Sequence, residues 1–266
     1  MNPQTKPTTV PEYRSWLAKE YDIEAGSALP NYYTSVTGSA REALLHHPFW
    51  TSLGQALRQA HDRYGLNTAY PLLIDPGPPD ILVKPYDSFL LKTFRKNILA
   101  NDCWPDPPEG GWLLPHRWLE RVNDVLRTQF VVKYLDGVDA LCTCLRQLAE
   151  SHSVYSHLDF EARDDGYYAA HLYIKTPLEV PAYNWDTWSP EFVLEIQVTT
   201  ELQYNIRRLL HKYYESRRVQ PMPTRHSLQW DYRSPEFSAS YLGHILHYVE
   251  AMIVELREKQ AERTML

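Results

Sequence analysis

The spacing of apolar residues along the chain predicts helices towards both of its ends. Apolar positions recur at helical intervals in four segments, which are residues 11–23, 40–65, 88–101 and 234–260. Gly65 is expected to end the second helix, and Pro235, which follows the capping residue Ser234, suits the first turn of the last one. The pattern therefore predicts a helical N-terminal part over about residues 11–70 and a C-terminal helix over about residues 234–260.

The middle of the chain has the pattern of strands. Apolar or alternating runs rich in β-branched and aromatic residues occupy residues 129–136, 153–160, 167–175 and 192–200. Helical spacing over residues 137–152 separates the first two runs, and a further helix over residues 201–218 is expected to follow the last run. Because helices lie at both ends with about four strands between them, and because no internal repeat is evident, we expect a single α/β domain over residues 1–266.

Composition excludes several classes of protein. The 266 residues are 44% hydrophobic and 23% charged, which is typical of a globular protein rather than of a disordered chain or a coiled coil. No run approaches the ~18 apolar residues of a membrane-spanning helix, and the first residues lack the apolar block of a signal peptide. We therefore expect a cytoplasmic protein with no membrane partner. The formal net charge of −6 disfavours a general nucleic-acid coat protein, and DNA is not expected as a partner.

The three cysteines are interpreted as reduced thiols. Cys103, Cys142 and Cys144 are too few for a disulfide framework, and a single C-x-C without a second ligand pair is a poor zinc site.

Two groups of polar residues are candidates for chemistry. Lys84, Ser88, Lys92, Arg95 and Lys96 lie on a loop and on the helix that follows it, where exposed backbone N–H groups also favour phosphate. The chain has no G-x-x-x-x-G-K-[ST] loop, and a basic helix face is also common on solvated surfaces.

The second group is a pair of carboxylates beside strands. Asp124 precedes residues 129–136, and Glu195 lies within the apolar run of residues 192–200. A glutamate inside an apolar strand is costly unless it is paired or coordinated. A Mg²⁺ ion shared with Asp124 would satisfy Glu195, since Mg²⁺ favours one or two carboxylates together with substrate phosphates.

Four segments, read in order, resemble the synthetase domain of the RelA/SpoT homologues, which make the ppGpp class of alarmones. They are VKPYDSFLLKTFRK, VNDVLRTQFVVKYLDGVDAL, DDGYYAAHLYI and EIQVTTELQYNIRRLLHKYY, and they cover a catalytic core of about residues 80–215. Within the family, GYYAAH, NDVLRT and YLGHILHYVEAMI are most similar to the toxic small alarmone synthetases. Some of those enzymes transfer pyrophosphate to the 3′ CCA end of tRNA, and others make alarmones. The resemblance implies a nucleotidyltransferase-like α/β fold, with a mixed sheet of about four to five strands flanked by helices.

The resemblance also implies a reaction, in which the β,γ-pyrophosphate of ATP moves to a ribose 3′-hydroxyl. The ATP phosphates would be bound by Lys84, Ser88, Lys92 and Arg95. Mg²⁺ would be held by Asp124 and Glu195, and Glu195 would also be the general base towards the acceptor hydroxyl.

On the acceptor side, the resemblance implies that Tyr167 stacks on the acceptor base. His171, Gln197 and His211 match family positions and would orient the site. The two histidines are equally consistent with satisfied core or second-layer residues.

Three positions depart from the family pattern. Leu82 and Gln129 stand where two arginines usually clamp the adenine of ATP, so that the base must be held otherwise, for example by Arg127. Tyr204 replaces the asparagine that reads guanine, although Asn205 is adjacent. A site that lacks its reading groups loses orders of magnitude of discrimination, so the resemblance does not extend to specificity for guanine.

These departures lead to the hypothesis that the acceptor is the terminal adenosine of tRNA. The supporting feature is a basic set that could grip acceptor-stem phosphates, formed by Arg207, Arg208, Lys212, Arg217 and Arg218. A solvated helix face is the alternative interpretation of this set. On the tRNA hypothesis the protein is a translation-inhibiting toxin, and its cell should carry a neutralising antitoxin protein or a hydrolase that removes the pyrophosphate.

Two other functions remain open. One is an alarmone synthetase that makes (p)ppGpp or (p)ppApp from free nucleotides. The other is a non-catalytic descendant of the fold that binds a nucleotide or a protein, which the missing adenine-clamp arginines motivate. Retention of both Asp124 and Glu195 argues against a non-catalytic protein.

Overall fold

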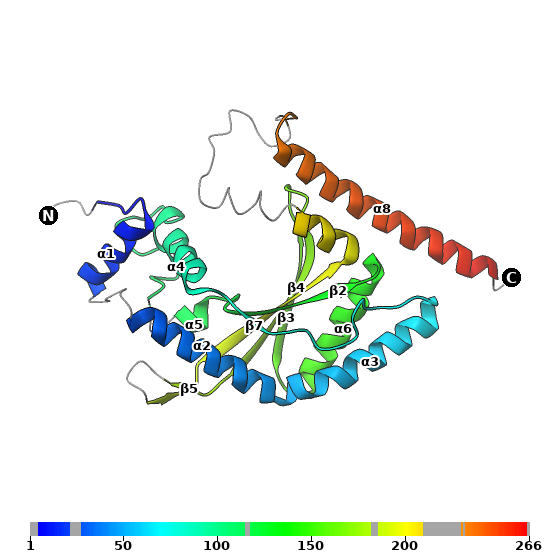
Figure 1. Ribbon diagram of the computed structural model, residues 1–266, viewed down its shortest axis with the longest axis horizontal. Coiled ribbons are helices and arrows are strands. Elements are labelled where there is room, and N and C mark those ends of the chain that lie inside the picture. The colour runs from blue at the N-terminus through cyan, green and yellow to red at the C-terminus, as the bar shows by residue number, and fades with distance from the viewer. Residues whose placement is uncertain are drawn as a thin grey trace. The chain divides into compact units, whose positions relative to one another are not determined.

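The computed structural model describes residues 5–21, 28–114, 118–181, 186–209, 230 and 232–264. These residues form an α/β fold whose main sheet has five strands in the order β1-β2-β7-β4-β3 (Figure 1). The α/β class and the five-stranded sheet confirm the expectation from the sequence. None of the helices in the described part of the chain is long and apolar enough to cross a membrane.

The chain forms two compact units. As far as they are described, the first unit contains residues 1–47, 81–127 and 175–195, and the second contains residues 48–80, 128–174 and 196–266. Three strands contribute residues to both units, namely β2 (Leu126–Val132), β4 (Tyr168–Pro177) and β7 (Glu191–Thr200). Strand β7 is the third of five and is buried almost continuously, as expected of a strand that is covered on both faces. The single domain over residues 1–266 stays a prediction.

Helices and short strands build the first unit around an aromatic core. Its elements are α1 (Val10–Tyr21), α2 (Ala28–His46), β1 (Leu82–Val83), α4 (Tyr86–Phe94), a π-helical segment (Arg95–Leu99), α5 (Trp118–Arg121), β5 (Val180–Pro181) and β6 (Thr187–Trp188). The core consists of Tyr13, Trp16 and Leu17 from α1 with Leu90, Phe94 and Ile98. Asn97 is buried beside it, where its amide nitrogen donates to Tyr13 Oη at 2.7 Å and to the Leu113 carbonyl at 3.0 Å. These contacts fix α4 and the π-helical segment in place.

Packed helices dominate the second unit. Its elements are α3 (Pro48–Thr68), α6 (Leu135–Ser151), β3 (Tyr155–Ala162), the helical residues 201–209 and α8 (Pro235–Thr264). Helix α3 packs along α6 (Figure 1). Arg257 ties α8 to both helices, because it forms an ion pair with Asp136 and donates a hydrogen bond to Tyr64 Oη at 3.1 Å. The position of α8 in this unit thus depends on a charged contact as well as on packing.

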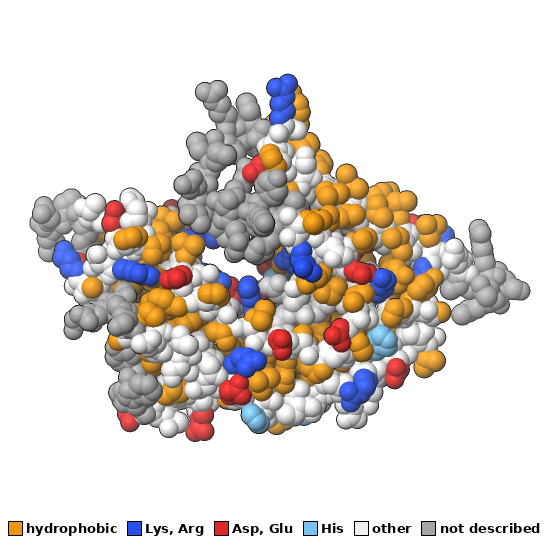
Figure 2. Space-filling view, in the orientation of Figure 1, with side chains coloured by type: hydrophobic (Ala, Val, Ile, Leu, Met, Phe, Trp, Pro, Cys, Tyr) orange, Lys and Arg blue, Asp and Glu red, His pale blue; other side chains and the backbone are white. Residues whose placement is uncertain are grey.

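Large apolar side chains are exposed along α8, and Figure 2 shows them gathered there. They are Tyr241, Leu242, Ile245, Tyr248, Val249, Met252 and Leu256. The helix therefore buries only part of its apolar surface within the second unit.

The structure corrects several predicted boundaries. The single helix expected over residues 40–65 is two helices that meet at His47, because Pro48 lacks an N–H and its ring clashes with the preceding turn. The strand expected over residues 129–136 is β2, which begins at Leu126 and ends at Val132. Half-buried positions alternate with buried ones along β2, and the apolar run that predicts a strand covers only its second half.

Other expected elements are shorter or longer than predicted. The helix of residues 88–101 begins at Tyr86 and becomes π-helical from Arg95. Strands β1, β5 and β6 were not predicted, because two residues carry no periodicity. The C-terminal helix is confirmed and continues to Thr264.

A buried carboxyl on α8 gives a pH-dependent prediction. Glu250 is 4% exposed, and burial raises its pKa to about 7, although hydrogen bonds with Thr200 and Gln203 act in the opposite direction. Because this folded-state pKa lies above the ordinary value of 4.5, the folded protein binds more protons than the unfolded chain, and stability is lost as the pH rises from about 4.5 to about 7. Glu250→Gln removes this loss, so we expect it to stabilise the protein by about 2 kcal/mol more at pH 8 than at pH 5.

Urea unfolding of the wild type and of Glu250→Gln at the two pH values measures this difference. Glu258→Gln, which removes an exposed carboxylate from the same helix, is the control. An equal change in stability at both pH values would contradict the prediction.

Candidate active site

In the first unit a carboxylate is held between two lysines. Lys84 Nζ lies 2.9 Å from Asp124 Oδ2, and Lys92 Nζ lies 2.8 Å from Asp124 Oδ1. We call these three residues the lysine–aspartate cluster. The side chains are partly buried, and that of Lys84 is only 12% exposed.

Local structure fixes each member of the cluster. Lys84 directly follows β1, which pairs antiparallel with β2 so that Val83 lies opposite Leu126. Its N–H donates to the Val125 carbonyl at 2.9 Å, and its own carbonyl accepts a hydrogen bond from Tyr33 Oη at 2.8 Å. Lys92 lies on α4, which packs against α1. Residues that are 32 and 40 positions apart from Asp124 are thereby brought together.

The cluster carries an excess of positive charge. Burial raises the pKa of the Asp124 carboxyl, but the hydrogen bonds and charges of Lys92 and Lys84 outweigh burial and lower the pKa below its ordinary value. Asp124 is therefore ionised at neutral pH, and two cations face one anion. Such a partly dry, net positive cluster can stabilise the oxygens of a phosphate chain.

In the second unit a tight turn presents an aromatic ring. The hairpin between β3 and β4 turns at Gly166, whose φ of +78° is a left-handed conformation that favours glycine. The N–H of Arg163 donates to the Tyr167 carbonyl at 3.0 Å across this turn. Tyr167 Oη is hydrogen-bonded to His171 Nε2 at 2.7 Å, and His171 is buried. The ring is thus held at both its backbone and its hydroxyl.

Two guanidinium groups lie over this ring. The Cζ atom of Arg207 is 4.0 Å from the centroid of the Tyr167 ring, and that of Arg163 is 4.5 Å from it. Arg163 also forms an ion pair with Glu161. We call Arg163, Tyr167, His171 and Arg207 the tyrosine site.

Neither a protein-family model nor a curated protein sequence matches this chain. Among solved structures, small alarmone synthetase 1 from Bacillus subtilis bound to its product pppGpp matches with a TM-score of 0.50 at 14% identity, over 83% of this chain and 97% of that one. The chain has the fold of the small alarmone synthetases.

Two further solved structures are similar to this chain. A GTP pyrophosphokinase family protein from Streptococcus pneumoniae gives a TM-score of 0.49 at 15% identity, over 84% of this chain and 95% of that one. Small alarmone synthetase 1 from Bacillus subtilis bound to AMPCPP gives 0.47 at 17% identity, over 83% and 97% of the two chains.

The predicted phosphate ligands divide into two groups within the small alarmone synthetase fold. Lys84 and Lys92 meet at Asp124, as described. Ser88 and Arg95 are exposed, the first on the first turn of α4 and the second directly after the end of this helix. The structure therefore brings two of the four side chains together around one carboxylate.

Glu195 lies inside β7, in the part of the strand that belongs to the first unit, and is 6% exposed. Among the described residues, no three or more His, Cys, Asp and Glu side chains group to hold a metal ion. A Mg²⁺ ion that completes its shell with phosphate oxygens and water needs only one or two carboxylates. Asp124 and Glu195 supply only carboxylate oxygens, which fits that chemistry.

Arg127 lies beside the positions that depart from the family pattern. It is half-buried on β2, directly opposite Leu82 of β1 in the antiparallel register. Opposite residues of paired strands project from the same face of a sheet. Alternation along β2 also puts Gln129 on that face, so Arg127 stands next to both positions that depart from the family pattern.

The remaining predicted residues are placed only in part. Gln197 is half-buried on β7, and Tyr204 lies in the helix of residues 201–209 with the Arg208 guanidinium 5.7 Å from its ring centroid. His211, Lys212, Arg217 and Arg218 lie outside the described residues. The basic set predicted to bind tRNA is therefore represented by Arg207 and Arg208 alone.

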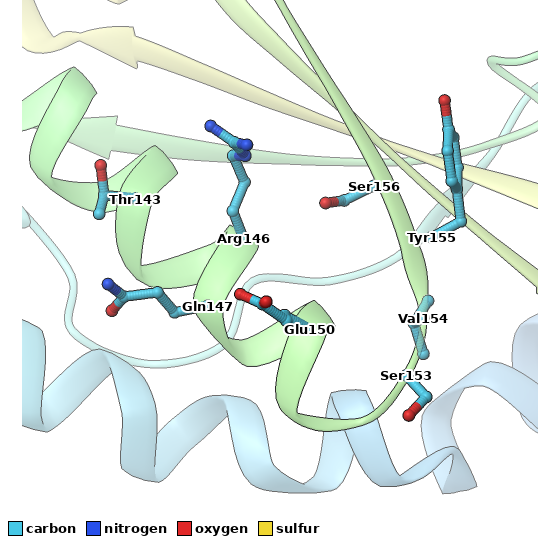
Figure 3. Close-up of a pocket in the computed structure, with 8 residues that line it drawn as sticks. All are labelled: Thr143, Arg146, Gln147, Glu150, Ser153, Val154, Tyr155 and Ser156. Atoms are coloured by element: carbon cyan, nitrogen blue, oxygen red, sulfur yellow. The ribbon is translucent and has the colours of Figure 1, made fainter.

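A large cavity in the second unit contains none of the residues predicted from the sequence. Its volume is about 680 Å³, and Figure 3 shows that it lies between the end of α6 and the start of β3. Arg146, Gln147 and Glu150 of α6 line one side, and Ser156 lies on the strand side. Its lining resembles an ordinary polar surface recess, because it combines one cation and one anion with short hydroxyl side chains.

Sequence reasoning missed Arg163 and Glu161. Both precede the D-D-G turn of the hairpin, and the sequence does carry a signal for them. In a tight hairpin the residues that flank the turn are cross-strand neighbours, so the position of Arg163 opposite Tyr167 could have been derived from the turn.

Proposed function

We propose that this chain is an ATP-dependent pyrophosphotransferase of the RelA/SpoT type. The observation that carries the proposal is the lysine–aspartate cluster, in which Asp124 is shared by Lys84 and Lys92. A binding module has no evident need of a partly buried cation pair organised by a carboxylate, whereas phosphoryl transfer depends on fixed positive charge around the moving group. The fold match to a synthetase bound to its product pppGpp supports the proposal.

The reaction transfers two phosphates in one step. The oxygen of the acceptor 3′-hydroxyl attacks the β-phosphorus of ATP, the bond between this phosphorus and the oxygen that bridges the α- and β-phosphates breaks, and AMP leaves. Glu195 takes the hydroxyl proton. Lys84 and Lys92 stabilise the charge that builds up on the phosphate oxygens, and Asp124 keeps the two ammonium groups in position.

A divalent cation fits this arrangement. Asp124 and Glu195 would hold it, and when bound it would neutralise charge on the phosphate oxygens. Arg127 holds the adenine in place of the arginines that are absent at Leu82 and Gln129.

The acceptor that we propose is the 3′ CCA end of tRNA, with inhibition of translation as the result. Tyr204 stands where the family reads guanine, and the guanidinium of Arg208 is 5.7 Å from its ring centroid, so this position is occupied by an aromatic–cation pair. Arg207 and Arg208 supply charge for acceptor-stem phosphates. A cell that makes such a toxin needs a neutralising antitoxin protein or a hydrolase.

A second function is favoured by one observation, namely the pppGpp product in the matched synthetase structure. On that alternative the chain is an alarmone synthetase that acts on a free purine nucleotide. Both functions share the donor side of the reaction and differ only in the acceptor.

Transfer of label from γ-³²P-ATP into deacylated tRNA, or into a panel of free guanine and adenine nucleotides, tests the proposal. We expect label in the tRNA band. Glu195→Gln keeps the shape of the side chain but accepts no proton, so it should lower the rate by about 10²–10⁴-fold. ATP labelled in its α-phosphate is the matched control and should label no acceptor, because this phosphate leaves as AMP.

The other outcomes are equally informative. Label only in small nucleotides would replace the tRNA proposal with alarmone synthesis. No transfer to any acceptor, or transfer that Glu195→Gln leaves unchanged, would overturn the enzymatic proposal and favour a binding module.

A further inference from the structure

The two arginines over the Tyr167 ring occupy the space that a stacked base needs. A guanidinium 4.0 Å from the ring centroid, as in Arg207, lies at the distance of a stacking partner. The second guanidinium, that of Arg163, is 4.5 Å from the same centroid. An acceptor base that stacks on the ring face covered by one of these groups therefore has to displace that guanidinium.

The surroundings of the two arginines decide which one moves. Arg163 is held by its ion pair with Glu161. The Nη1 atom of Arg207, in contrast, is buried and has no hydrogen-bond partner. A charged donor that is buried without an acceptor raises the free energy of the protein more than an exposed donor does, because water can bind the exposed one. Arg207 gives up a side-chain hydrogen bond with Tyr167 when its guanidinium leaves the ring, and its Nη1 atom gains an acceptor where an anionic oxygen is offered.

The ring itself stays in place. Tyr167 is fixed by its hydrogen bond with His171 and by the backbone hydrogen bonds of the hairpin turn. The Tyr167 N–H also donates a hydrogen bond to Asp165 Oδ1 of the turn at 3.2 Å. Only a rotamer change of the Arg207 side chain is needed to uncover the ring, and such changes are fast.

We propose that Arg207 is a specificity-determining residue. In the absence of acceptor its guanidinium covers the Tyr167 ring. When the base of the acceptor nucleotide displaces the guanidinium, Arg207 binds the 5′-phosphate of the same nucleotide. This inference rests on the proposed function, because it assigns the Tyr167 ring to the acceptor. The ligand class is a nucleotide with a phosphate on its 5′ side, which describes both the last residue of tRNA and a free purine nucleotide. A nucleoside also displaces the guanidinium, but it has no phosphate oxygen that could accept a hydrogen bond from it.

Equilibrium binding tests the inference independently of transfer. The probes are two pairs, adenosine with AMP and guanosine with GMP, measured by calorimetry in the presence of saturating AMPCPP so that the donor site is filled. Only the binding that Tyr167→Ala abolishes is assigned to the tyrosine site. We expect the wild type to bind AMP at least 10-fold more tightly than adenosine, or GMP at least 10-fold more tightly than guanosine.

Arg207→Gln should reduce this preference to about one, while the nucleoside binds as tightly as before or more tightly. Arg207→Lys keeps the charge and should retain part of the preference. Arg58→Gln, the same charge change on an exposed position of α3, is the control and should keep the wild-type preference.

Three results would overturn the inference. An equal loss of nucleoside and nucleotide binding in Arg207→Gln would indicate a merely structural role. An unchanged preference in that variant, or a wild type that binds none of the four probes through Tyr167, would also contradict it. If preference is lost in Arg207→Gln although no pyrophosphate transfer is found, the inference about the acceptor phosphate stands and the proposed reaction fails.

Discussion

Lys84→Met is expected to lower kcat/KM for ATP by about 10²–10³-fold, the loss that follows when one fixed donor to a charged transition state is removed. Methionine keeps the length and apolar stem of lysine but not its charge. The cluster then has one cation for one anion, so its net positive charge disappears. The pKa of Asp124 should also rise towards its ordinary value, because Lys84 contributes both a hydrogen bond and a charge that lower it.

Steady-state transfer assays at saturating acceptor measure this loss. Lys19→Met is the matched control in the same unit, since the Lys19 side chain is 80% exposed on α1 and should leave kcat/KM unchanged. Equal activity of the wild type and Lys84→Met would show that the cluster is a structural ion pair with no role in transfer.

The second large effect is a loss of stability, which we expect when a side chain is introduced at the contact between α8 and the hairpin turn. A Cβ atom at Gly243 would lie 2.3 Å from the Gly166 carbonyl oxygen, and a Cβ at Gly166 would lie 2.2 Å from the Ser240 carbonyl oxygen. The obstructing atoms are backbone atoms, and hydrogen bonds hold them. Ser240 Oγ donates to the Asp164 carbonyl at 2.9 Å, and Gln203 Nε2 donates to the Gly243 carbonyl at 3.1 Å.

Gly243→Ala should therefore destabilise the protein by about 1–3 kcal/mol, the usual cost of forcing a methyl group into a packed site. It should also weaken binding of the acceptor, because the turn that is pushed away carries Tyr167. Gly38→Ala is the control. A Cβ at Gly38 meets nothing within 4 Å, and this helical position should gain about 0.5–1 kcal/mol.

Urea unfolding of both variants, together with the acceptor-binding assay, checks this pair of expectations. If Gly243→Ala were as stable as the wild type, the close approach of α8 to the hairpin would be disproved. If it lost stability but bound the acceptor normally, α8 would not position Tyr167.

Local pattern alone was sufficient for much of this chain. Helical spacing marked α1, α6 and α8, and the nearly continuous apolar runs marked β4 and β7, because these features depend on residues close together in the sequence. The basic residues between Lys84 and Lys96 likewise predict a phosphate site, because they lie on a loop and on the helix that follows it. Where two residues form a strand, as in β1, the sequence carries no comparable signal.

Contacts between distant residues were decided only by the tertiary structure. Nothing in the spacing of Lys84, Lys92 and Asp124 says that both ammonium groups share one carboxylate, since β1 pairing and the packing of α4 bring them together. The same holds for Arg207 over Tyr167, which are 40 residues apart, and for Gly243 against Gly166. The sequence by itself determined which chemical groups this protein carries and on which elements, and the tertiary structure decided which of them meet, because burial and charge pairing act through space rather than along the chain.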